Sequence, residues 1–214
     1  NGFDFLKLEG AAAVGNGIVA PTEDEAEAYI QAWNNYKAEG HNITKFVPAS
    51  GAASRMFKDM FSFANADYDV PTTPFEKKYF DDLENFAFYN ALNETCNQLY
   101  SKDIKQLTAE GDYKAIAKAM LSSEGMDYGQ LPKGLLLFHN YDDGPRTPME
   151  EHLVEGALYG ASNGKSSIHF TVSHEHLPLF KKKVEDKASK YSEKFGITYD
   201  ISFSEQKSST DTIA

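Results

Sequence analysis

The stretch that decides the fold is Lys45-Phe46-Val47-Pro48-Ala49-Ser50-Gly51-Ala52-Ala53-Ser54-Arg55-Met56-Phe57-Lys58. A short apolar run, residues 43–47, is followed by small residues that lead directly to Arg55. Small side chains let a backbone approach a ligand closely and leave its N–H groups free. We therefore predict a buried strand, a loop and a helix beginning at Ser54. The positive end of that helix, with the charges of Arg55 and Lys58, would hold a phosphate group.

The composition is that of an acidic globular protein. The chain has 214 residues, of which 41% are hydrophobic and 13% aromatic. This is enough for one well-buried core and argues against disorder. The net charge of −11 is unfavourable for general nucleic-acid binding, which needs a basic face. A nucleotide can still bind where cations are concentrated, and the two arginines are Arg55 and Arg146.

The single cysteine, Cys96, excludes a disulfide within this chain and a zinc site built on several thiolates. No run approaches the ~20 apolar residues of a membrane helix, and the first residues lack the pattern of a signal peptide. We therefore expect a cytoplasmic protein with no membrane partner. The chain begins at Asn1 rather than Met and ends soon after an expected strand. We expect it to be a piece of a longer protein, incomplete at its C-terminus.

The hydrophobic periodicity predicts two parts. Residues 1–42 form a lead-in and a helix, which a Thr22–Glu25 capping box opens. Residues 43–214 form an α/β domain with a helical insertion at about 75–123. The expected strands are 43–47, 134–138, 168–172 and 197–203, and the expected later helices are 148–161 and 177–195. This order predicts a mainly parallel sheet with helices on both faces, a three-layer α-β-α Rossmann-like fold. Ligands then lie at the carboxyl ends of the strands.

A second motif, Leu131-Pro132-Lys133-Gly134-Leu135, gives the first one a context. Together they resemble the sugar-phosphate nucleotidyltransferases of the GT-A fold (nucleotide-diphospho-sugar transferase-like), including the UDP-sugar pyrophosphorylase branch. That family has a first strand, then Leu-Ala-Gly-Gly-x-Gly-Thr-Arg, then a later Pro-Lys. Residues 146–152, 168–173 and 203–206 are similar to its following segments, whereas Ser50 and Ala53 stand where it has glycine. The residue pattern of the motifs is most similar to an uncharacterised bacterial domain-of-unknown-function family that is related to these enzymes.

The resemblance implies transfer of a nucleoside monophosphate from a nucleoside triphosphate to a sugar phosphate or similar phosphorylated small molecule, with Mg²⁺ and release of pyrophosphate. Arg55 would neutralise the leaving group, and Lys133 would bridge the α-phosphate and the attacking phosphate. Gln206 would read the base, and Asp211 would help to hold the metal. The implied nucleotide-binding positions are Ala49, Ser50, Gly51, Ala52, Ala53, Ser54, Lys58 and Gln206.

Other interpretations remain open from the sequence alone. The small-residue loop is also what a tight strand-to-helix turn needs, and Lys133 is also compatible with an ordinary surface lysine. Asp211 suits a helix cap, and His174 and His176, two positions apart, suit a helix start better than a metal site. The alternative functions are a non-catalytic nucleotide or sugar-phosphate binding protein of the same fold and a protein-interaction module formed by the helical insertion. The base, the acceptor and the oligomeric state are not specified.

Overall fold

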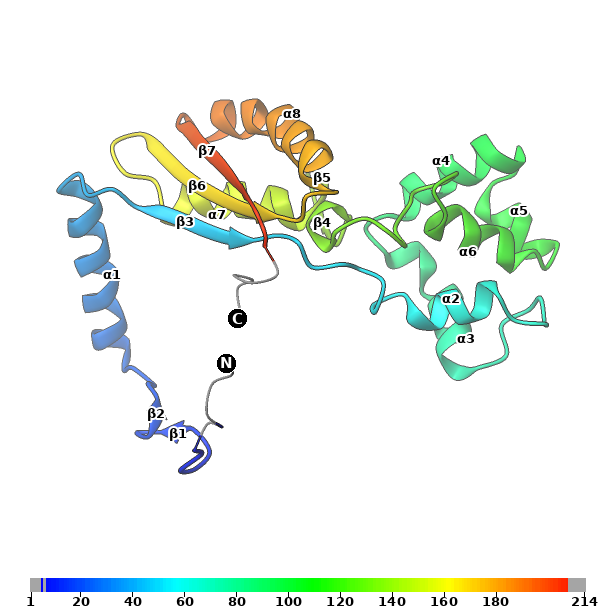
Figure 1. Ribbon diagram of the computed structural model, residues 1–214, viewed down its shortest axis with the longest axis horizontal. Coiled ribbons are helices and arrows are strands. Elements are labelled where there is room, and N and C mark those ends of the chain that lie inside the picture. The colour runs from blue at the N-terminus through cyan, green and yellow to red at the C-terminus, as the bar shows by residue number, and fades with distance from the viewer. Residues whose placement is uncertain (1–4, 6, 208–214) are drawn as a thin grey trace. The chain divides into compact units, whose positions relative to one another are not determined.

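The computed structural model describes residue 5 and residues 7–207 (Figure 1). The chain divides into two compact units, Asn1–Asn42 and Ile43–Ala214. The first unit contains β1 (Ala13–Val14), β2 (Gly17–Ile18) and α1 (Glu23–Ala38). The predicted capping box is confirmed, because the Thr22 hydroxyl accepts from the Glu25 amide and the Glu25 carboxylate accepts from the Thr22 amide at 2.8 Å.

The second unit is a mixed α/β structure built around a parallel sheet. Its strands are β3 (Thr44–Pro48), β6 (Lys165–Val172) and β7 (Thr198–Glu205), hydrogen-bonded in the order β3-β6-β7. Helix α7 (Pro148–Tyr159) precedes β6, and α8 (Leu177–Phe195) connects β6 to β7. The predicted α/β class, its parallel sheet, three of its four predicted strands and both late helices are confirmed.

Both late helices pack on the same face of this sheet, so the expected three-layer arrangement is wrong for the described part of this unit. Ile168, Phe170 and Val172 of β6 are fully buried, and they share one core cluster with Leu153 of α7 and Phe180 of α8. The strands follow one another in a single direction across the sheet. Right-handed crossovers then place each connecting helix on the same side.

The opposite face of the sheet is polar and partly open. Phe46 of β3 is 55% exposed, and its ring stacks on His169 of β6 at 5.6 Å between centroids. The two ring nitrogens of His169 lie 2.8 Å and 2.9 Å from the hydroxyls of Ser202 and Ser204 on β7. Alternate residues therefore differ in exposure along β3, along β6 up to Phe170 and along β7 up to Phe203, as expected for a sheet with one covered face.

The helical region forms its own core. It contains α2 (Lys58–Ala64), α3 (Pro74–Asp81), the short 3₁₀ helix η1 (Leu83–Asn85), α4 (Tyr89–Tyr100), α5 (Ile104–Ala109) and α6 (Tyr113–Leu121). Figure 1 shows these helices gathered together. The largest fully buried side chains of this cluster come from four of the helices and are Phe63, Met60, Leu92, Leu107, Ile116 and Met120. The predicted helical character of residues 75–123 is confirmed, and α2 belongs to the same cluster.

Two predicted elements are wrong. The helix expected from Ser54 begins at Lys58, because residues 54–57 form a turn in which the Met56 amide donates to the Ala53 carbonyl. The strand expected at 134–138 is instead a short 3₁₀ helix, η2 (Lys133–Leu135), followed by a hairpin of β4 (His139–Tyr141) and β5 (Gly144–Arg146).

The reason for the missing strand lies in two adjacent side chains. Leu135 packs in the cluster under the sheet, and Leu136 packs in the helical cluster. The apolar run therefore connects two cores instead of adding a strand to one. A short apolar run has the same sequence signature in both situations.

Candidate functional site: a pocket at the end of the first sheet strand

A pocket of about 220 Å³ lies at the carboxyl end of β3. It draws on four separate segments: the end of β3 and its loop, the start of η2, the first turns of α7, and α8. Its lining residues are Val47, Pro48, Ala49, Gly51, Lys133, Gly134, Pro148, Met149, His152 and Phe180. The position agrees with the rule that ligands of parallel sheets bind beyond the carboxyl ends of the strands.

The backbone joins the two sequence motifs at this pocket. Ala52 and Pro132 form an antiparallel bridge, and the Lys133 amide donates to the Gly51 carbonyl at 2.9 Å. The Ala49 amide donates to the Thr171 carbonyl at 2.8 Å, which extends the β3–β6 ladder into the loop. Residues about 80 positions apart in the chain thus line one cavity, and Lys133 projects from a backbone that is fixed by these bonds.

The loop keeps hydrogen-bond donors available. Within the described residues, the amides of Ser50, Gly51, Ser54 and Arg55 donate to no other residue. A Cβ atom added at Gly51 would meet nothing within 4 Å, so this residue faces open space. Unpaired backbone N–H groups on a turn are a common way of binding anions.

The structure brings together three of the predicted site residues, because Ala49, Gly51 and Lys133 all line the pocket. Arg55 and Lys58 do not line it; both are exposed and form no ion pair with a described residue. Ser50, Ala52, Ser54 and Gln206 are also outside the lining, and the side chain of Ala53 is fully buried in the helical core. The backbone amide of Gln206 extends the sheet by donating to the Val172 carbonyl at 3.0 Å. Asp211 lies outside the described residues.

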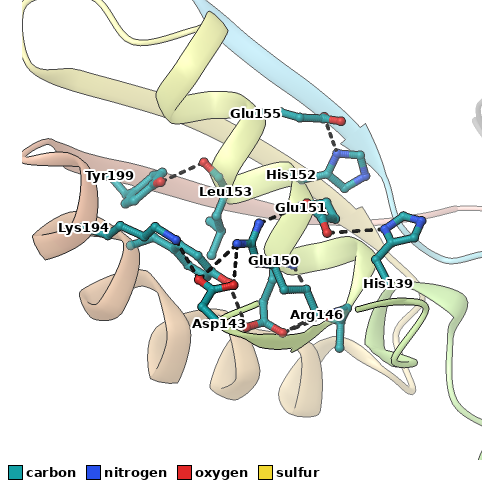
Figure 2. A network of polar contacts seen from close by, with 12 residues as sticks. His139, Asp143, Arg146, Glu150, Glu151, His152, Leu153, Glu155, Lys194 and Tyr199 are labelled. Atoms are coloured by element: carbon teal, nitrogen blue, oxygen red, sulfur yellow. Dashed lines mark hydrogen bonds and ion pairs between the residues drawn. The ribbon is translucent and has the colours of Figure 1, made fainter. Parts of the chain in front are cut away.

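Sequence reasoning missed His152, which lines the pocket from α7. Its Nδ1 lies 3.3 Å from Glu155 Oε2 (Figure 2). Glu155 also pairs with Lys45 of β3. Burial lowers the pKa of His152, and the charge of Lys45 lowers it further. The hydrogen bond from Lys45 lowers the pKa of Glu155. The imidazole is therefore neutral at pH 7, and a proton on Nδ1 donated to Glu155 leaves Nε2 as an acceptor.

The signal for this group was present in the sequence but depends on tertiary structure. His152 and Glu155 are three positions apart, which places them on one side of a helix that Thr147 and Pro148 clearly open. Only the pairing of β3 with α7 through the sheet core brings Lys45 to them. No spacing along the chain encodes that contact.

The other arginine, Arg146, lies with its guanidinium beside the carboxylates of Asp143 and Glu151 (Figure 2). Its guanidinium is 2.9 Å from Asp143 and 3.7 Å from Glu151, and it lies 4.0 Å from the centre of the Tyr141 ring. Hydrogen bonds from Lys194 and then from Arg146 lower the pKa of Asp143 to about 2. Arg146 is only 8% exposed and connects the hairpin to α7 through Glu151, while Asp143 connects it to α8 through Lys194.

The described lining does not fit a metal ion held by protein ligands. It contains no carboxylate, and the nearby Glu155 is occupied by Lys45 and His152. Across the described residues, no cluster of three or more His, Cys, Asp or Glu side chains is placed to hold a metal. His176 is hydrogen-bonded to Ser173 at 2.8 Å and to the Gln130 carbonyl at 3.1 Å.

The fold and the pocket define an α/β protein with a parallel sheet and a cavity at the carboxyl end of its first strand. The chain belongs to DUF4301, a family described as a domain of unknown function, whose model matches residues 1–214. No curated protein and no solved structure matches it. In the described part of the chain, no helix has the length and apolar character needed to cross a membrane.

Proposed function

We propose that the pocket at the end of β3 binds the phosphates of a nucleotide, and that the protein transfers a nucleoside monophosphate from a nucleoside triphosphate to a phosphorylated small molecule such as a sugar phosphate. The observation that carries this proposal is the hydrogen bond from the Lys133 amide to the Gly51 carbonyl. It places a lysine opposite a loop of small residues with unpaired amides. This is the arrangement expected for the two motifs in a nucleotidyltransferase.

The chemistry asks mainly for positioning and charge. The attacking group is itself a phosphate oxygen, which forms a bond to the α-phosphorus as the bond to pyrophosphate breaks. The ammonium of Lys133 would lie between the two phosphates, and the amides of residues 50–54 would hold the leaving group. Arg55, exposed and without an ion-pair partner among the described residues, would neutralise the pyrophosphate. His152 would accept a hydrogen bond from a substrate hydroxyl through Nε2.

Mg²⁺ would supply further charge neutralisation in such a reaction, but the described lining offers it no carboxylate. The proposal therefore assigns no step to a protein-bound metal. Its essential residues are Lys133 and the loop, and both can be tested directly.

The experiment is calorimetric titration of the full chain with UTP, CTP, GTP, ATP and dTTP, and with hexose monophosphates, with and without Mg²⁺. Pyrophosphate release is measured for each pair of substrates. The variant Lys133→Ala should weaken binding of the preferred triphosphate by about tenfold or more, because a charge-assisted contact is worth ~1.5–3 kcal/mol. The matched control is Lys182→Ala, an exposed lysine of α8 outside the pocket.

Two results would count against the proposal. One is the absence of binding by every triphosphate and sugar phosphate at millimolar concentration. The other is that Lys133→Ala and Lys182→Ala weaken triphosphate binding equally. Loss of any positive charge would then explain the weaker binding, without a contact between Lys133 and the ligand.

A second candidate, non-catalytic binding of a nucleotide or sugar phosphate, is favoured by one observation. Arg55 does not line the pocket, although the reaction needs a cation on the leaving group. Binding that depends on Lys133 without pyrophosphate release, for any pair of substrates, would select this candidate.

A further inference from the structure

A second cavity, of about 360 Å³, lies in the helical region. Its walls come from the turn before α2 and α2 itself, from α3, from residues 85–88, and from the segment that follows η2. The lining residues are Met56, Phe57, Met60, Phe75, Tyr79, Asn85, Phe86, Ala87, Phe88, Tyr128, Leu136, Leu137, Phe138 and Asn140. Protein cores are close-packed, and their internal voids seldom exceed a water molecule. A cavity of this size is in the range of small-molecule sites.

The lining is almost wholly apolar and carries no charge. None of its residues is Asp, Glu, Lys, Arg or His. Tyr79 donates its hydroxyl hydrogen to the Met120 sulfur at 2.9 Å. The Tyr128 hydroxyl accepts from the Leu137 amide at 3.1 Å, so its own hydrogen is the one that a ligand could still receive. Burial also raises the pKa of both tyrosines, which keeps them neutral. A charged ligand would lose its hydration here without gaining a partner.

The aromatic wall is made of rings that pack against one another. Phe86 lies 5.2 Å from Tyr79 and 5.3 Å from Phe88, measured between ring centroids. Tyr128 closes the set, in contact with Phe88 at 5.6 Å and with Phe57 at 6.1 Å. Rings that fix one another in this way leave a preformed cavity, so a ligand need not pay to assemble it.

The other polar side chains of the lining are the amides of Asn85 and Asn140. Both residues are exposed and contribute to the lining, and neither amide is hydrogen-bonded to a described residue. They can give a ligand one or two orienting hydrogen bonds. A cavity of about 150 Å³ accommodates benzene, so the larger volume here suits two or three rings or an equivalent aliphatic group.

From the volume, the uncharged lining and the locked aromatic wall, we infer that this cavity binds an uncharged, largely apolar small molecule of two or three rings, with a hydrogen-bonding group near its exposed end. The site is separate from the phosphate pocket and does not depend on the proposed nucleotide chemistry. It has no lining residue in common with that pocket.

The test uses two fluorescent probes that share one ring system. N-phenylnaphthylamine is uncharged, and anilinonaphthalene sulfonate adds a single negative charge. Titration of the full chain with the uncharged probe should give saturable binding at one site. The sulfonate should bind at least about tenfold more weakly, since its charge finds no partner in the cavity.

Three variants locate the probe. Ala87→Phe fills the cavity, and Phe138→Ser removes a wall residue that is 37% exposed and so perturbs the fold less than a change at a fully buried wall residue. Each should weaken binding of the uncharged probe by about tenfold. Leu158→Ser, which removes an apolar side chain of α7 that is 53% exposed and outside the cavity, should leave binding unchanged.

The inference is overturned by the absence of saturable binding of the uncharged probe to the folded chain. It is also overturned if the sulfonate binds as tightly as the uncharged probe, or if Phe138→Ser and Leu158→Ser have equal effects. Thermal melts of each variant establish that it is folded. If Ala87→Phe fails to fold, the comparison of Phe138→Ser with Leu158→Ser decides the question.

Discussion

Replacing Gly51 with alanine should separate ligand binding from folding at the phosphate pocket. Gly51 lines the cavity, its φ angle is not in the left-handed region, and an added Cβ would meet no atom within 4 Å. Alanine therefore fits the folded backbone without strain. The new methyl group enters the space that a phosphate would occupy.

The substitution should raise the stability of the protein and lower its affinity for the ligand. A glycine-to-alanine change at a compatible position stabilises a protein by about 0.4–1 kcal/mol, because it restricts the unfolded chain. For a chain of this size, that raises the midpoint of thermal unfolding by about 1–4 °C. Binding should weaken by about tenfold, since an added methyl group in a filled site costs ~1–3 kcal/mol.

The assay pairs urea unfolding with calorimetric titration of the preferred phosphate ligand. Gly10→Ala is the matched control, because Gly10 also has open space around its Cβ position but lies outside the pocket. Gly134→Ala is the contrasting variant, since its Cβ would lie 3.0 Å from the buried ring of Phe180 and should lower stability as well. Unchanged affinity in a stable Gly51→Ala protein would refute the placement of the ligand. Marked destabilisation would refute the assumption that the glycine serves the ligand.

Three further outcomes are expected. Tyr191→Phe removes a buried hydroxyl that donates to Glu150 at 3.1 Å, and should lower the free energy of unfolding by ~1.5–3 kcal/mol. Burial raises the pKa of Glu150, but the hydrogen bonds to its carboxylate outweigh burial and leave the pKa below 4.5. The difference in unfolding free energy between Tyr191→Phe and the unmodified protein, measured by urea unfolding, should therefore become smaller as the pH falls below about 4.5. The hydrogen bond from Lys194 is the main cause that lowers the pKa of Asp143 to about 2. Asp143 therefore contributes stability that is present above pH 3.8 and is lost as the pH falls through about 2. The variant Asp143→Asn should show a smaller change in unfolding free energy over this pH range. Cys96 is fully buried, and this burial raises its pKa to about 11, so its reaction with an aromatic disulfide reagent at pH 8 should be at least about 100-fold slower in the folded protein than in urea.

The sequence predicted well those elements whose signals are local. The capping box at Thr22 and the proline at position 148 predicted helix starts, and the structure has helices beginning at Glu23 and at Pro148. The alternation of apolar residues in 197–203 predicted β7, and the apolar spacing of 177–195 predicted α8. Each of these signals is carried by neighbours within one or two turns of chain.

The elements that were missed depend on contacts between distant parts of the chain. The run 134–138 has the composition of a strand, but Leu135 and Leu136 enter different cores. The helix expected at Ser54 begins later because Ala53 and Phe57 are both buried in the helical cluster, which fixes the turn between them. Composition specifies that such residues are buried, but it does not specify in which core.

The residues of the site also divide into those that local motifs predicted and those that only tertiary contacts bring together. The two motifs predicted that Gly51 and Lys133 would lie at one cavity, and the structure places both in its lining. The group of His152, Glu155 and Lys45 was not predicted, because it forms only when β3 lies beside α7. The apolar cavity of the helical region was not predicted either. Its lining residues have the pattern of an ordinary core, and the space between them exists only in three dimensions.

The sequence left open whether the small residues of the loop serve a tight turn or a phosphate site. In the structure, different residues of the loop support different answers. Ala53 is fully buried in the helical core, and a larger side chain there would be overpacked. Gly51, two residues earlier, faces open space and has no packing reason to be small. Packing therefore accounts for the end of the motif but not for its middle. This difference is the reason to test Gly51 before any other residue of the loop.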